Sequence, residues 1–203
     1  ADIDVGETGT VVVNEGSILN AGNESTETMT ITGNLAADGG NINTYGTASV
    51  SGTTTLGDGA LLAAKTGTLA VNDMAVSGTS NVTGAVTTGG IEADDEAVDE
   101  DTTYLIVGDS DTTTTDTLTT TKDINLADGA VIVRSDATLN VGTADTAKDT
   151  PLNVNTTLIA SNGTIKTYGK ATAGDIALAD STLSAAKDST LTMEEMGVSG
   201  TST

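Results

Sequence analysis

Carboxylates are the side chains of this sequence best suited to chemistry, and they concentrate in one stretch. Seven of them fall within residues 92–101, and two more follow at positions 109 and 111 after a short apolar segment. Calcium takes six to eight oxygen ligands, mostly carboxylates and carbonyls, so this stretch predicts a calcium site. The alternative, favoured because EF-hand spacing is absent, is a solvated and self-repelling loop. The candidate ligands are Asp94, Asp95, Asp99, Asp101, Asp109 and Asp111.

Catalysis by paired carboxylates is a weaker interpretation. Glycoside hydrolysis needs two carboxylates at a set separation, usually beside aromatic rings on which sugars stack. The chain has three Tyr and no Phe or Trp, and it also lacks His and Cys, which serve most often as general base and thiol nucleophile. We therefore predict that the protein is not an enzyme, has no catalytic residues and binds no cofactor other than calcium.

A long internal repeat organises the elements that carry these residues. The segment TYG at 44–46 returns at 167–169, and VSGTS at 76–80 returns at 198–202. Residues 1–121 are thus one long repeat, and residues 122–203 form a second, incomplete one. Such self-similarity predicts a repeat architecture, in which function resides on extended surfaces more than in one pocket.

A shorter period of about 20 residues runs inside each long repeat. Each segment has a corner of glycine and polar residues, as in LGDGAL at 56–61, and an apolar run such as TLAV at 68–71. Runs this short, rich in Val, Ile, Leu and Thr and bounded by Gly, Asn, Asp or Ser, are typical of strands joined by tight turns. One coil of such strands cannot bury its inner face, but stacked coils can. We predict an all-β fold, a parallel β-solenoid of about ten coils. Its expected inward residues are Leu35, Ile42, Ala48, Leu56, Leu61, Leu69, Val71, Met74 and Val76.

The regularity fails between residues 92 and 122. We interpret this part as an acidic protrusion that contains a strand at 104–107 and then re-enters the rod; a domain break is the other option. Neither end of the chain carries an evident cap, and stacked coils without caps expose pairing edges. The sequence therefore predicts an extended assembly.

Composition limits the partners. Aromatic residues make up 1% of the chain, which argues against sandwiches and α/β enzymes, whose cores use Phe and Trp. The net charge is −22, with 7 basic residues against 29 acidic ones, which argues against nucleic acid and anionic membranes as partners. No apolar run is long enough to insert into a membrane. A chain that begins at Ala1 fits a mature exported protein, or equally a fragment.

Threonine pairs suggest one further surface. Thr-x-Thr occurs at 66–68, 115–117, 117–119 and 190–192, and flat threonine arrays on solenoids bind ice in some antifreeze proteins. The pairs do not recur at one fixed position of each 20-residue segment. The sequence therefore predicts no flat threonine lattice, and threonine is also simply a good strand residue.

The segments GTLAVN at 67–72, ATLNVG at 137–142 and STLTM at 189–193 resemble the Gly-x-Leu-x-Val repeats of bacterial surface β-solenoids. These are the passenger regions of autotransporters and the filamentous-haemagglutinin-type adhesins. The resemblance implies an exported protein, located outside the cell or on its surface.

Two functions follow as expectations. The first is a structural solenoid that self-associates into a fibre, sheath or surface layer. The second is an adhesin, a binding module that recognises a ligand on a host or neighbouring cell.

Overall fold

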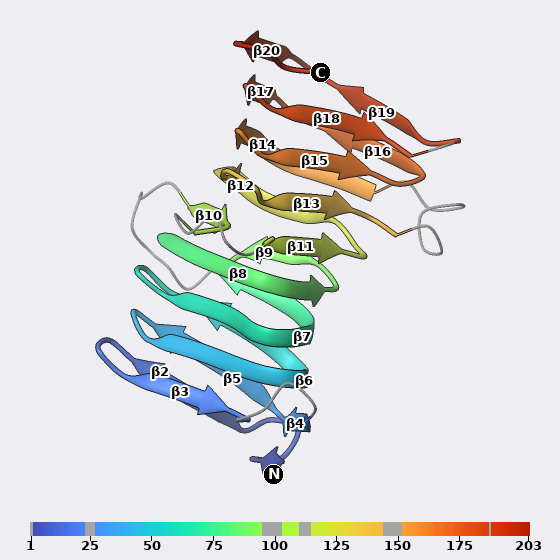
Figure 1. The fold of residues 1–203 in the computed structure, drawn as a ribbon. Helices are drawn as coiled ribbons and strands as arrows, with labels where there is room; N and C mark the ends of the chain where they lie inside the picture. Colours follow the sequence, from blue (N-terminus) through green and yellow to red (C-terminus); the bar gives the residue numbers. More distant parts are fainter. Residues whose placement is uncertain (1, 23–26, 95–102, 110–114, 144–151, 187) are drawn as a thin grey trace.

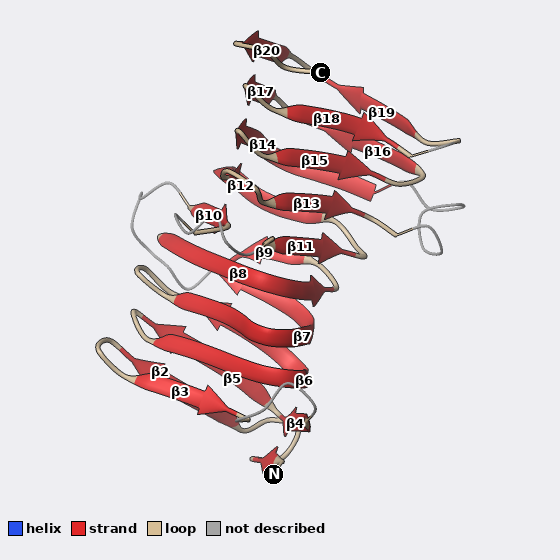
Figure 2. Ribbon diagram, in the orientation of Figure 1, coloured by secondary structure: helices blue, strands red, loops and turns tan. Residues whose placement is uncertain are grey.

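The chain folds into a stack of short parallel strands, in a computed structural model that describes residues 2–22, 27–94, 103–109, 115–143, 152–186 and 188–203. Every element in these ranges is a strand or a loop (Figure 2). They contain no helix long and apolar enough to span a membrane. The predicted all-β solenoid is confirmed, with about eight turns and a period of about 21 residues.

The strands pair in parallel along the whole rod (Figure 1). In chain order they are β1 (Ile3–Asp4), β2 (Thr10–Asn14), β3 (Ile18–Ala21), β4 (Thr28–Thr32), β5 (Asn34–Asp38), β6 (Asn41–Leu56), β7 (Leu61–Val76), β8 (Thr79–Thr88), β9 (Ile91–Ala93), β10 (Tyr104–Val107), β11 (Thr117–Thr120), β12 (Ile124–Val133), β13 (Thr138–Val141), β14 (Leu152–Ser161), β15 (Thr164–Thr167), β16 (Lys170–Ala173), β17 (Ile176–Ala179), β18 (Thr182–Ala185), β19 (Thr190–Met193) and β20 (Met196–Ser199).

Each coil has three faces, which the strand register defines. Face A stacks residues 28–31, 47–50, 68–71, 85–88, 117–120, 138–141, 164–167 and 182–185. Face B begins with 10–13, 34–37, 53–56 and 73–76 and continues through β9, β12, β14, β16 and β19. Face C begins with 18–21, 41–44, 61–63 and 79–82 and continues through β10, β12, β14, β17 and β20.

The coil number is about eight instead of the predicted ten because the period is not constant. Val50 pairs with Val71, but Thr88 pairs with Thr120 and Val141 with Thr167, so some turns use more chain than others. Strand β10 was predicted at its observed position. It pairs with β8 and β12, so the two long repeats continue one rod without a break in pairing.

The core is a narrow aliphatic column inside the three faces. Alternate residues of each strand point inward, and eight of the nine residues predicted to do so are buried. Leu61 is the exception, because it pairs outward with Asn41 while its neighbour Leu62 is fully buried. Fully burying one such side chain stabilises the fold by roughly 1.5 to 3 kcal/mol. Alanines such as Ala48, Ala60 and Ala160 fill places where the column is thin.

Candidate functional site

Side chains at the corners join one coil to the next. Asp58 Oδ1 accepts a hydrogen bond from the backbone N–H of Thr79 at 2.8 Å. The equivalent Asp180 of the second long repeat accepts from the N–H of Thr201, also at 2.8 Å. Corner N–H groups lie outside the regular ladder and need such partners. Part of the acidic composition therefore has a structural role. The same arrangement occurs at Asp2, Asn34, Asp73 and Asp123.

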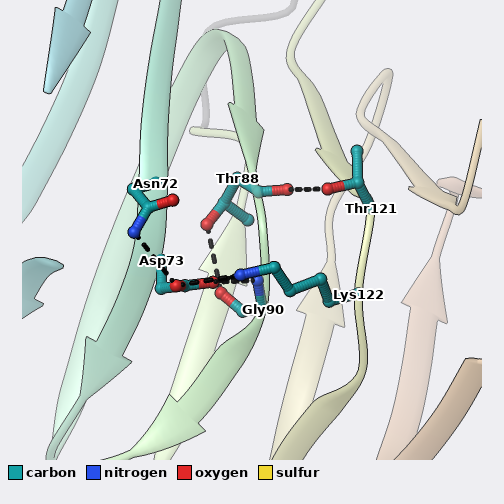
Figure 3. Close-up of polar contacts among 6 residues, drawn as sticks. All are labelled: Asn72, Asp73, Thr88, Gly90, Thr121 and Lys122. Carbon is teal, nitrogen blue, oxygen red and sulfur yellow. Dashed lines mark hydrogen bonds and ion pairs between the residues drawn. The ribbon is translucent and has the colours of Figure 1, made fainter. Parts of the chain in front are cut away.

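The most elaborate corner lies at Asp73 on face B (Figure 3). The Lys122 ammonium donates to Oδ1 of Asp73 at 2.8 Å and to Oδ2 at 3.0 Å. The backbone N–H of Gly90 donates to Oδ1 at 2.7 Å, and the Asn72 amide donates to Oδ2 at 3.2 Å. Thr121 continues the cluster by donating to the carbonyl oxygen of Thr88 at 3.3 Å. Lys122 thereby joins two coils across the one that contains Gly90.

This environment shifts the titration of Asp73. Partial burial acts to raise the pKa of Asp73, but the hydrogen bond from Gly90 and the charge of Lys122 outweigh it. The net result holds the pKa below its ordinary value of 3.8. The carboxyl group is therefore ionised at neutral pH and serves as an acceptor.

An open groove of about 780 Å³ lies beside this corner, and its lining includes Asp73, Glu92, Asp94 and Asp123. Asp73 and Asp123 are already occupied by backbone donors. Among the described lining residues there is no histidine or cysteine that could act as a base or nucleophile. The groove lies beside a corner where Asp73 and Asp123 accept backbone hydrogen bonds, and sequence reasoning missed it because its lining residues lie far apart in the chain.

A second corner contains a buried carboxylate, Asp116, which is 3% exposed. It accepts hydrogen bonds from the backbone N–H groups of Gly84 at 2.5 Å and Asp109 at 3.1 Å. Both oxygens are thus used by the backbone. This residue connects the end of β10 to face A and was not predicted from the sequence.

Two of the six candidate calcium ligands lie in the described ranges. Asp94 follows β9, where its N–H donates to the carbonyl oxygen of Val76, and Asp109 follows β10. Asp95, Asp99, Asp101 and Asp111 lie outside the described residues. Within the described part, no three acidic side chains gather as a metal-binding group. Calcium binding stays a prediction.

The outward sides of the faces carry two further features that the sequence reading missed. On face A the register aligns single threonines in one row. The Thr-x-Thr pairs did not reveal this row, because they share no fixed position, and the pair at 190–192 lies on face B. The uneven period hides the alignment until the strands are paired. On face C the register aligns an outward aliphatic row, made up of Ile18, Asn41, Leu61, Asn81, Ile106, Ile132, Ile159, Ala177 and Gly197.

The fold therefore places the protein in the class of parallel β-solenoids, with its distinctive side chains on outward faces. Comparison of the chain with protein-family models, with curated proteins and with solved structures finds no match. The resemblance to autotransporter and haemagglutinin-type repeats stays a prediction, and function has to be argued from the surfaces themselves.

Proposed function

We propose that the protein is an extracellular structural solenoid whose rods associate side by side through face C, as part of a surface fibre, sheath or layer. The observation that supports this is the outward aliphatic row. Five of its nine positions are Ile or Leu, although the inward columns already supply the core.

Several large aliphatic side chains of this row are exposed to solvent, whereas an ordinary outward face carries polar side chains. Ile18 is 60% exposed, and Ile132 and Ile159 are partly exposed on neighbouring coils. Ile106 is buried yet lies outside the core cluster, as expected for an outward position. Three consecutive positions of the row, Ile106, Ile132 and Ile159, are large and aliphatic, while Asn41 and Asn81 interrupt it nearer the N-terminus. An outward aliphatic patch is a typical surface for association with another protein.

The size of the strip sets the expected strength. Eight coils at about 4.8 Å and four residues at about 3.3 Å give the whole of face C an area on the order of 500 Å² per copy, of which the aliphatic row is a part. That is below the roughly 800 Å² per partner of standard stable interfaces, so a single contact is weak. The net charge of −22 adds repulsion between copies. Association should therefore increase with protein concentration and with salt, which screens charge over about 10 Å at 0.1 M.

Sedimentation velocity and electron microscopy of the 203-residue chain test the proposal. We expect concentration-dependent association that rises with salt, and the variant Ile159→Glu should remain monomeric under the same conditions. The matched control is Thr138→Glu, which introduces the same charge at a half-exposed outward position of face A. It should associate like the unaltered chain, and thermal melts check that both variants fold.

A chain that stays monomeric at all concentrations contradicts the proposal. Monomers that attach to cells only when a particular surface ligand is present would support the adhesin function instead.

A further inference from the structure

Two outward rows run up face A (Figure 1, where β11, β13, β15 and β18 stack one above another). The first row contains Thr28, Thr47, Thr68, Ala85, Thr117, Thr138, Thr164 and Thr182. The second row, two residues further along each strand, contains Thr30, Ser49, Ala70, Thr87, Thr119, Asn140, Lys166 and Ser184. Seven of the eight positions in the first row are threonine.

Strand preference alone does not explain this concentration. Threonine suits any strand position, so a general preference would spread it over all three faces. On face C the outward row through Ile106 contains no threonine at nine positions. The row two residues before it aligns Thr79, Tyr104, Ala130 and Thr157, so threonine there is mixed with other residues. The corresponding row of face B starts Thr10, Asn34, Thr53, Asp73 and so mixes threonine with amide and acid. The regular row is a property of face A.

Charge is also excluded from these rows. The chain has 29 acidic residues, yet none lies in the two rows, and Lys166 is their one charged member. An acidic rod with one face nearly free of charge offers that face to a neutral partner. Ions, nucleic acid and charged peptides fit it poorly.

The hydroxyl groups of the first row are available to solvent. No protein hydrogen bond within the described structure involves the side-chain hydroxyls of Thr28, Thr47, Thr68, Thr117, Thr138 or Thr164. Each hydroxyl has one donor and two acceptor positions, and each threonine adds a methyl group beside it. The row therefore presents repeated, unoccupied hydrogen-bonding groups.

The spacing of the array is regular in both directions. The shifts in strand register fall between residues 44 and 45, 50 and 53, and 63 and 68, outside the aligned face A segments. Successive positions of the first row are thus about 4.8 Å apart along the rod. The second row lies about 6.7 Å away along each strand, and five of its eight positions carry a hydroxyl group. Both distances are close to repeat distances of the oxygen lattice of ice.

We propose that face A binds ice, with its threonine hydroxyls and methyl groups holding a layer of water in lattice positions. This proposal is independent of lateral association through face C. A crystalline polysaccharide also has a regular surface, but sugar rings usually pack on aromatic side chains, and neither row contains one.

Ice shaping and thermal hysteresis of the purified chain, measured in a nanolitre osmometer, test the proposal together with ice-affinity partitioning. We expect faceted crystals, a measurable hysteresis gap and enrichment in the ice fraction. The variants Thr117→Tyr and Thr138→Tyr should lose most of the hysteresis, because a ring that projects from face A keeps the neighbouring hydroxyls away from the ice lattice. Tyrosine is a good strand residue, so these outward changes should leave the melting temperature close to that of the unaltered chain.

The matched control is Thr172→Tyr, an exposed outward position on face B. It should retain full hysteresis. The proposal is overturned if the unaltered chain neither shapes ice nor partitions into it, if Thr172→Tyr loses as much activity as the face A variants, or if the chain binds microcrystalline cellulose or chitin but not ice.

Discussion

At the scale of single residues, corner carboxylates replace the missing ladder partners of backbone N–H groups. Asp58→Ala removes the acceptor for the N–H of Thr79. We expect this change to lower the free energy of unfolding by about 0.5 to 1.5 kcal/mol, as the loss of an ordinary hydrogen bond does. Chemical denaturation measures the difference. Asp58→Asn keeps an acceptor oxygen and should recover most of the loss; equal destabilisation by both variants would show that charge, not the hydrogen bond, matters at this corner.

The Asp73 corner should make stability depend on pH. Because the folded-state pKa is lowered, the contribution is fully present above the ordinary value of 3.8 and is lost as pH falls through the folded value. Asp73→Asn should therefore destabilise the protein at neutral pH, and the difference from the unaltered chain should shrink below pH 3.8.

Urea unfolding at a series of pH values measures this difference. Lys122 and Asp73 are 59% and 36% exposed, so the ion pair itself contributes no more than about 1 kcal/mol. Lys122→Gln leaves the Gly90 hydrogen bond in place and should reduce the pH dependence without abolishing it. A pH-independent effect of Asp73→Asn would contradict this account.

Calcium binding by the acidic stretch has a direct thermal test. A ligand that binds only the folded state at 100 times its dissociation constant adds about 2.7 kcal/mol to stability. We expect calcium to raise the melting temperature more than an equal ionic strength of sodium chloride does. An identical melt in calcium and in chelator would remove the prediction.

At the scale of strands and corners, stacked glycines allow coils to approach closely. Gly67 has a φ of 93°, and a Cβ there would overlap the carbonyl oxygen of Gly46 on the coil below. Gly16 has a similar φ of 72° but has open space around it. Gly16→Ala should cost roughly 1 to 2 kcal/mol from backbone conformation alone. Gly67→Ala should cost more, and denaturation curves of the pair isolate the effect of the stacked carbonyl.

The positions of the strands could be predicted from the sequence. The inward or outward direction of the side chains could be predicted for most residues but not for all. In TLAV at 68–71 the alternation is strict, and Leu69 and Val71 point inward as predicted. At 61–64 four apolar residues follow one another, so alternation gives no sign of which leucine is inward. The pairing with Asn41 settles it, because Asn41 is outward and Leu61 lies against it. The threonine row was missed for a related reason, since unequal turns conceal positions that only pairing aligns.

The difference between the inward Leu69 and the outward Leu61 predicts how much each alanine substitution lowers the free energy of unfolding. Leu69→Ala leaves a cavity in the core column and should cost about 2 to 5 kcal/mol. Leu61→Ala, on the outward side, should cost much less. Denaturant midpoints measured with equal slopes would support this assignment of faces.

At the scale of the whole molecule, the rod holds 29 acidic residues against 7 basic ones. Repulsion among them opposes the compact state and is screened by salt over about 10 Å at 0.1 M. We expect sodium chloride to raise the melting temperature progressively. An uncharged osmolyte of equal osmolality serves as the control, and an unchanged melt in salt would contradict a destabilising role for charge repulsion.

Among the described residues, each inner coil pairs with the coils directly above and below it, and Gly46 and Gly67 occupy the same place in successive coils. Excising residues 46–66 would consequently join Tyr45 to an equivalent glycine and shorten the molecule by one increment of about 4.8 Å. The length of the rod is therefore set by the number of coils, and removing one coil should leave the pairing register of the coils on either side intact.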